Sequence, residues 1–213
     1  MEIVLVTGSA RSGKSTFAEK YAAAAARQIL GLLPEQELPE QSLAYLATAQ
    51  IFDEEMRFRV QRHQARRSKI WQTYEVPVES LAMKAIQEAG KKQKALLFDC
   101  VTIYLSNLLC ACTEAELADE AGLYLCVEKA IGSLIAAAET VQEPTVLVFV
   151  TNEVGAGIVP ENALARRYRD LAGLANQQLA EAAKSVYLTV CGQAINIKSL
   201  ALDAAMAAAH DFK

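Results

Sequence analysis

A glycine-rich run near the amino end of the chain has the residue types and spacing that bind nucleotide phosphates. It follows a short apolar segment and matches the pattern G-x-x-x-x-G-K-[ST] with Gly8, Ser9, Ala10, Arg11, Ser12, Gly13, Lys14 and Ser15. Glycines let backbone N–H groups approach phosphates, and the following helix N-terminus adds partial positive charge. We expect Lys14 to reach the β- and γ-phosphates and the Ser15 hydroxyl to bind Mg²⁺. Arg11 is either a further phosphate contact or a solvated loop residue. The alternative for the whole run is an ordinary glycine-rich turn. The complete sequence pattern and its place between a strand and a helix disfavour this alternative.

A carboxylate stands directly after another apolar segment. Asp99 follows residues 95–98, Ala-Leu-Leu-Phe. In open α/β sheets, ligands bind at the carboxyl ends of the strands. We therefore predict that Asp99 and Ser15 together hold the Mg²⁺ of a bound nucleotide; the alternative is a helix-capping aspartate.

His63 is the candidate nucleophile. It shares a helical face with Met56 and Val60, which by itself favours a histidine packed in a core. Arg62, Arg66 and Arg67 flank it, however, and guanidinium groups suit phosphate binding better than a core. Neighbouring positive charge also favours the neutral imidazole, which is a competent nucleophile.

A third polar stretch follows the apolar run that ends at Val150. Asn152 and Glu153 are expected at the same sheet edge as Thr7 and Asp99, before a glycine-rich turn. An ordinary β–α loop is the alternative. Basic residues in the next helical pattern would contact either an anionic substrate or solvent: Arg166, Arg167 and Arg169.

These groups need a scaffold, and the apolar pattern predicts a parallel sheet. Strand-like runs lie at 3–6, 43–46, 95–98, 146–150 and 186–190, and helical patterns lie near 13–30, 52–67, 78–93, 115–139 and 160–183. The runs are almost continuously apolar, which is typical of strands buried on both faces. The alternation predicts an α/β fold with right-handed crossovers in one domain over residues 1–213, with a surface loop at 31–42 and a helical tail at 199–213.

Composition narrows the class of protein. The 213-residue chain is 53% hydrophobic and 22% charged, with a net charge of −4, which argues for a sizeable core and against a nucleic-acid binder. The five cysteines include no C-x-x-C pair, which suits a reducing compartment rather than a zinc site. The first apolar run begins at once and no apolar stretch approaches a membrane span, so we expect a cytoplasmic protein with no signal peptide.

Several stretches together resemble the bifunctional adenosylcobinamide kinase/adenosylcobinamide-phosphate guanylyltransferase family of cobalamin biosynthesis. They span nearly the whole chain in order: VTGSARSGKS, YLATAQIFDEEM, RVQRHQ, WQTYE, LLFDCVTIYLSNLL and VTNEVGAGIVPENALARRYRDLAGLANQQLA. The last is far more specific than the phosphate pattern. The resemblance implies a P-loop NTPase with a RecA-like, mostly parallel sheet, and a homotrimer.

The resemblance also implies the activity. Such an enzyme phosphorylates adenosylcobinamide with a nucleoside triphosphate, ATP or GTP. It then transfers GMP from GTP to adenosylcobinamide phosphate through a histidine–GMP intermediate, with Mg²⁺, and releases pyrophosphate. The nucleophile falls on His63. Nucleotide contacts fall on the 8–15 run and on Ala47, Thr48, Ala49, Gln64, Ala65, Arg66, Arg67, Glu75 and Asp99.

The sequence departs from the family pattern at a few of these positions. Arg62 stands where the family often has a first histidine, and Gln64-Ala65-Arg66-Arg67 stands where it has Lys-Asp-Gly-Arg; Asp99 replaces a common glutamate. Two alternatives therefore remain open. Either a single activity is retained, or the chain is a nucleotide-switched RecA-like binding protein, in which His63 would have no role.

Overall fold

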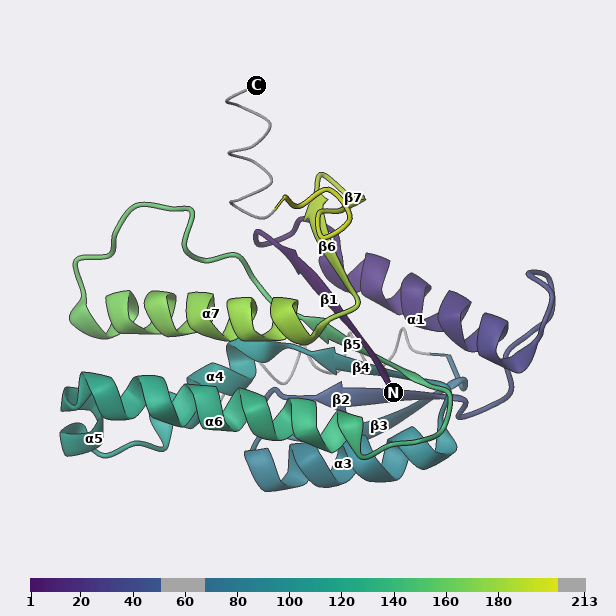
Figure 1. Ribbon diagram of the computed structural model, residues 1–213, viewed down its shortest axis with the longest axis horizontal. Coiled ribbons are helices and arrows are strands. Elements are labelled where there is room, and N and C mark those ends of the chain that lie inside the picture. The colour runs from purple at the N-terminus through teal and green to yellow at the C-terminus, as the bar shows by residue number, and fades with distance from the viewer. Residues whose placement is uncertain (51–67, 203–213) are drawn as a thin grey trace.

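The computed structural model describes residues 1–50 and 68–202, which form a seven-stranded sheet with helices on both faces (Figure 1). The strand order is β3-β2-β4-β5-β1-β6-β7. The strands are β1 (Glu2–Gly8), β2 (Leu43–Ala47), β3 (Trp71–Glu75), β4 (Ala95–Asp99), β5 (Val146–Val150), β6 (Ser185–Val190) and β7 (Gln193–Asn196). All neighbours pair in parallel except β6 and β7. The predicted P-loop, RecA-like sheet is confirmed: β5 lies between β1, which carries the glycine-rich run, and β4, which carries Asp99.

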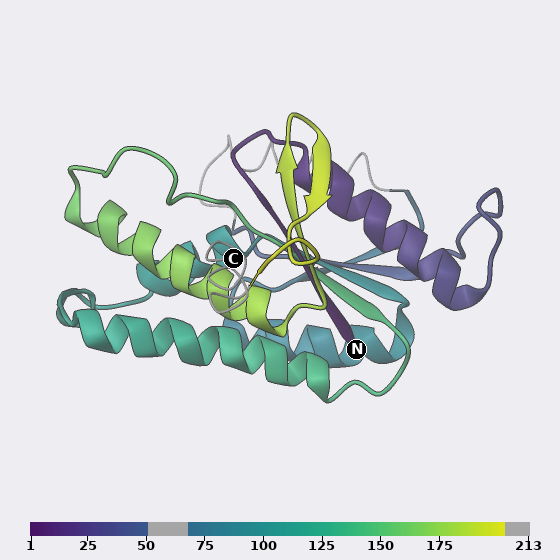
Figure 2. The same ribbon diagram turned by 45° about the horizontal axis from the view of Figure 1, so that its top comes forward.

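The helices are divided unequally between the two faces (Figures 1 and 2). They are α1 (Lys14–Leu30), α3 (Glu79–Lys92), α4 (Val101–Cys110), α5 (Glu114–Ala118), α6 (Glu120–Glu139) and α7 (Ala163–Ala182). Among the helices of residues 1–50 and 68–202, α1 alone covers one face, where its buried Ala18, Ala22 and Ala26 allow close approach to the strands. α3, α4, α6 and α7 cover the other face around a larger core that includes Phe98 and Phe149.

All of the predicted strands are present. The strands β3 and β7 and the helix α4 were not predicted. β3 is an edge strand whose side chains are partly exposed, so it lacks the apolar run of a central strand. β7 is an edge strand joined to β6 by a tight turn at Cys191 and Gly192, both with positive φ. α4 is apolar almost all round, and such a segment shows no helical period in the sequence.

Some predicted helix bounds were wrong. The single helix predicted over 115–139 is two helices, because Asp119 caps a new helix by accepting a hydrogen bond from the Gly122 N–H. α7 begins at Ala163 rather than near Pro160, since the Asn162 side chain caps it. Residues 31–42 form the predicted loop, and 199–202 are not helical. The helix predicted over 52–67 and the tail from 203 onward lie outside the described residues.

α6 also bears on the membrane prediction. Of the helices that the structure describes, it alone is long and apolar enough to cross a bilayer. Its apolar face is buried against α3 and α7, with Val127, Ile131 and Leu134 fully covered. A core helix of this kind passes the same test of length and composition.

Candidate nucleotide-binding and catalytic site

The carboxyl edge of the sheet brings the predicted site residues together. Glu75, Ala47 and Asp99 occupy one register row across β3, β2 and β4. The row continues through Val150 of β5 to Val6 of β1, two residues before Gly8. The strand ends therefore place the glycine-rich run and Asp99 at the same edge of the sheet, separated by β5.

The phosphate loop, residues 8–15, needs its glycines. Gly13 has φ of 95°, and a Cβ there would lie 2.9 Å from the Gly192 Cα. A Cβ on Gly8 would lie 2.6 Å from the Thr189 backbone oxygen. The Lys14 ammonium donates to the Ser9 carbonyl at 3.1 Å, across the loop. This lysine thus lies over the concave loop where phosphates would bind.

The β6–β7 hairpin supports the phosphate loop from outside, beside the carboxyl end of β1 (Figure 1). The buried Thr189 hydroxyl donates to the Thr7 carbonyl at 3.0 Å and accepts from the Ser12 hydroxyl at 2.7 Å. The Gly192 N–H donates to the Ser12 carbonyl at 2.8 Å. Ser12 is therefore held through both its side chain and its backbone.

Replacing Thr189 with valine is expected to lower the free energy of unfolding by about 1–3 kcal/mol, because the buried Ser12 hydroxyl and Thr7 carbonyl would lose their partner. Nucleotide affinity should fall as well, since Ser12 belongs to the phosphate loop. Urea denaturation and a GTP titration measure the two effects. Thr189→Ser keeps the hydroxyl and should restore both; a valine variant as stable as wild type would contradict the role of this hydrogen bond.

Asp99 is held by β2. The Tyr45 hydroxyl donates to Asp99 Oδ2 at 2.7 Å. Thr48, fully buried, donates through its hydroxyl to the Cys100 carbonyl at 2.9 Å and accepts from the Cys100 N–H at 2.8 Å. Because the Thr48 side chain is used in this way, any nucleotide contact from Ala47, Thr48 and Ala49 falls more naturally on the two half-exposed alanines.

A buried polar network connects the Asp99 segment to the end of β5. The Thr102 hydroxyl contacts the Cys100 thiol at 2.9 Å and accepts from the Asn152 side chain at 2.9 Å. Asn176 of α7 donates to the Asn152 carbonyl and accepts from the Thr151 hydroxyl. Burial raises the pKa of Tyr168 to about 12, so its phenol stays protonated and donates to the Thr102 carbonyl at 2.9 Å. The network fixes the loop after β5, and Asn152 lies where it was predicted.

The charges at this edge suit a magnesium–nucleotide complex. Burial raises the pKa of the Cys100 thiol and the Asp99 carboxylate adds to this, whereas the Thr102 hydrogen bond and the Lys14 ammonium oppose it. Lys14 and Asp99 therefore both act electrostatically on one thiol. Asp99 Oδ2 is occupied by Tyr45, which leaves Oδ1 for a metal ion. With the Ser15 hydroxyl in the first turn of α1, these oxygens fit Mg²⁺, which favours one or two protein ligands and keeps water in its other positions.

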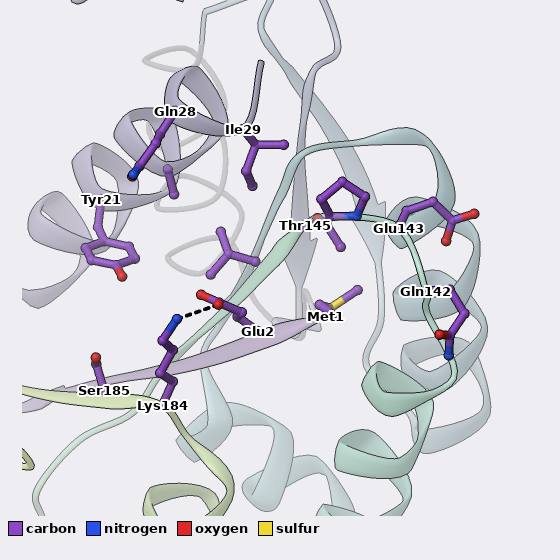
Figure 3. Close-up of a pocket in the computed structure, with 13 residues that line it drawn as sticks. Met1, Glu2, Tyr21, Gln28, Ile29, Gln142, Glu143, Thr145, Lys184 and Ser185 are labelled. Carbon is purple, nitrogen blue, oxygen red and sulfur yellow. Dashed lines mark hydrogen bonds and ion pairs between the residues drawn. The ribbon is translucent and has the colours of Figure 1, made fainter. Parts of the chain in front are cut away.

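A wide hollow elsewhere in the molecule is not this site. It has a volume of about 690 Å³ and lies at the amino edge of the sheet, between α1 and the start of β5 (Figure 3). Within this hollow, Lys184 Nζ and Glu2 Oε1 form an ion pair 2.5 Å apart, and both side chains are mostly exposed. This hollow lies far from the phosphate loop. Its lining mixes the acidic Glu2 and Glu143 with the basic Lys184, so it does not present a cluster of like charges to a ligand.

Part of the predicted site falls outside the described residues: His63, Gln64, Ala65, Arg66 and Arg67. Glu75 is exposed at the end of β3. Arg166 and Arg167 donate to backbone carbonyls, of Pro160 and Leu117 among others, so the structure gives them local partners. Sequence reasoning missed Tyr45 and Thr189, whose roles depend on which strands are neighbours.

Comparison with known proteins identifies the family. The family model for cobinamide kinase / cobinamide phosphate guanyltransferase matches residues 4–197. The chain belongs to this family. The match includes the phosphate loop, the Asp99 segment and the β6–β7 hairpin, so the elements that build the site lie within the family's common part.

Curated relatives in the family match along almost their full length. The bifunctional adenosylcobalamin biosynthesis protein CobU of Salmonella typhimurium is 39% identical over 201 residues, which cover 92% of this chain and 99% of the relative. CobU of Escherichia coli is 40% identical over 202 residues, with the same coverage. CobP of Pseudomonas aeruginosa is 37% identical over 195 residues, covering 91% and 96%. The family resemblance drawn from the quoted stretches is confirmed.

Proposed function

We propose that this chain is a bifunctional transferase that phosphorylates adenosylcobinamide and then attaches GMP to the resulting phosphate. The observation that carries the proposal is the convergence of Lys14, Ser15 and Asp99 at one sheet edge. Membership of the cobinamide kinase / cobinamide phosphate guanyltransferase family supplies the substrate class, and the curated relatives are named as bifunctional proteins.

In the kinase step, the acceptor hydroxyl oxygen attacks the γ-phosphorus of ATP or GTP. The bond from the γ-phosphorus to the bridging oxygen breaks, the nucleoside diphosphate leaves, and the hydroxyl proton is released. Lys14 and the loop N–H groups stabilise the charge on the transferring phosphoryl oxygens. Ser15 and Asp99 would hold Mg²⁺, which when bound would offset the negative charge of the phosphates.

In the guanylyl step, His63 is the nucleophile. An imidazole nitrogen attacks the α-phosphorus of GTP, a nitrogen–phosphorus bond forms, and pyrophosphate leaves. An oxygen of adenosylcobinamide phosphate then attacks the same phosphorus and releases the imidazole. The GMP group is thus transferred in two displacements at the α-phosphorus, in place of one direct attack of one anionic substrate on the other. Gln64 to Arg67, Ala47 to Ala49 and Glu75 are assigned to nucleotide contacts in the same proposal.

The proposal is tested by incubating the protein with Mg²⁺ and GTP labelled at the α-phosphate, without a corrinoid. We expect a protein-bound label that survives base and is lost in mild acid, as a phosphoramidate should be. Adenosylcobinamide phosphate should discharge the label into product. Absence of label while GTP still binds would overturn the covalent mechanism, and label without phosphorylation of adenosylcobinamide would show that the kinase activity has been lost.

The proposal also includes a homotrimer in the cytoplasm. Exposed apolar side chains on the loop before α7 and at its start support self-association: Ile158 is 96% exposed, Val159 57% and Leu164 46%. All of the cysteines are free thiols, which supports a reducing compartment. Light scattering should give three times the 23.1 kDa chain mass, and a monomer mass would exclude the trimer.

A further inference from the structure

Tyr45 is the group that fixes the direction of the Asp99 carboxylate. The two residues lie on neighbouring parallel strands, and the phenol donates to Oδ2 at 2.7 Å. A hydrogen bond to an ionised acceptor is shorter and stronger than a neutral one. Since a phenol has a single proton to donate, this proton is committed to Asp99.

Tyr45 is itself held firmly. Its side chain is 5% exposed, and its ring packs edge-on against Trp71 of β3 with centroids 6.1 Å apart. The ring belongs to the core between the sheet and α1, together with Val148 and Leu97. A ring fixed by packing can hold a carboxylate in one rotamer, which a solvated partner cannot do.

The backbone beyond the carboxylate is fixed by the residue that follows the same strand. Thr48, three residues after Tyr45, binds both the N–H and the carbonyl of Cys100 through its hydroxyl. The Thr48 carbonyl accepts in turn from the Asn107 side chain of α4 at 2.8 Å. Tyr45 of β2 thus holds the Asp99 side chain, and Thr48, directly after β2, holds the backbone of the next residue.

We propose that Tyr45 is a positioning residue for the metal-binding carboxylate. By occupying Oδ2, it presents Oδ1 of Asp99 to the Mg²⁺ of a nucleotide complex and keeps the carboxylate from rotating. The inference rests on the magnesium role of Asp99 in the proposed function, and it adds a residue that the sequence pattern did not point to.

The test is the dependence of GTP affinity on metal, measured by calorimetry with Mg²⁺ and again with EDTA. The ratio of the two affinities measures how much the metal ion contributes to GTP binding, and it does not require the enzyme to turn over. In Tyr45→Phe this ratio should fall about tenfold, which corresponds to the loss of one hydrogen bond to a charged group. Affinity in EDTA should stay at the wild-type value. Tyr74→Phe is the matched control: its hydroxyl contacts Gln93 at 3.5 Å, and its ring packs on the opposite face of the sheet.

A double-mutant cycle with Asp99→Asn separates positioning from general packing. If Tyr45 acts through Asp99, adding Tyr45→Phe to Asp99→Asn should change the metal ratio no further. An unchanged ratio in Tyr45→Phe, or an equal loss of affinity in EDTA, would overturn the inference, and so would a variant that fails to fold. Wild-type protein whose GTP affinity is the same with Mg²⁺ and with EDTA would instead refute the proposed metal site itself.

Discussion

Replacing His63 with alanine is expected to abolish the protein-bound GMP label and to lower guanylyl transfer by a factor on the order of 10⁴ or more, the scale of losing a covalent nucleophile. Phosphorylation of adenosylcobinamide should continue at close to its wild-type rate, because that reaction passes directly from the nucleotide to the acceptor hydroxyl. The measurement is a pair of assays on one preparation: label on the protein, and phosphate transferred to adenosylcobinamide.

His210→Ala is the matched control for this prediction. The chain has two histidines, and His210 lies outside the stretches that resemble the family. The control should therefore keep both activities and the full label. If the label persisted in His63→Ala, another residue would be the nucleophile. A parallel collapse of phosphorylation would mean that His63 supports both reactions, and the separation of the two chemistries would then be wrong.

Replacing Lys14 with alanine should impair both reactions together. Lys14 lies across the phosphate loop, bonded to the Ser9 carbonyl, and within electrostatic reach of the Asp99 segment. Removing one such preorganised charge should lower kcat by roughly 10²–10³ in each reaction. Steady-state kinetics of phosphorylation and of label formation would measure the two losses.

Lys20→Ala is the comparison for Lys14→Ala. Lys20 lies on the same helix, α1, but is exposed and about one and two-thirds turns further along. The change in net charge is the same, so a loss restricted to Lys14→Ala assigns the effect to the phosphate loop. Equal losses in the two variants would indicate a diffuse electrostatic effect, and wild-type rates in Lys14→Ala would remove this lysine from the site.

The parts of the site that sequence predicted are those encoded by a strand followed by a polar residue. Asp99 at the end of β4 and Asn152 after β5 were placed correctly at one edge because parallel strands share a direction. The phosphate loop was predicted because its pattern and its strand–loop–helix context are local.

The parts that were missed depend on strand order, which periodicity does not encode. Tyr45 matters because β2 is next to β4, and Thr189 matters because β6 is next to β1. In the sequence both look like ordinary core residues of a strand. The same limit applies to α4: with apolar residues on nearly every side, Val101–Cys110 has no polar stripe to show its period.

The support of the phosphate loop by the β6–β7 hairpin has a consequence for the synthesis of the chain. The loop leaves the ribosome long before Thr189 and Gly192, which hold Ser12: Ser12 and Thr189 are 177 residues apart in the sequence. β1 also pairs on its two sides with β5 and β6, so its own strand neighbours are translated late. A nascent chain would therefore acquire its nucleotide affinity only after the β6–β7 hairpin has been translated, and products truncated before the hairpin should not compete for GTP.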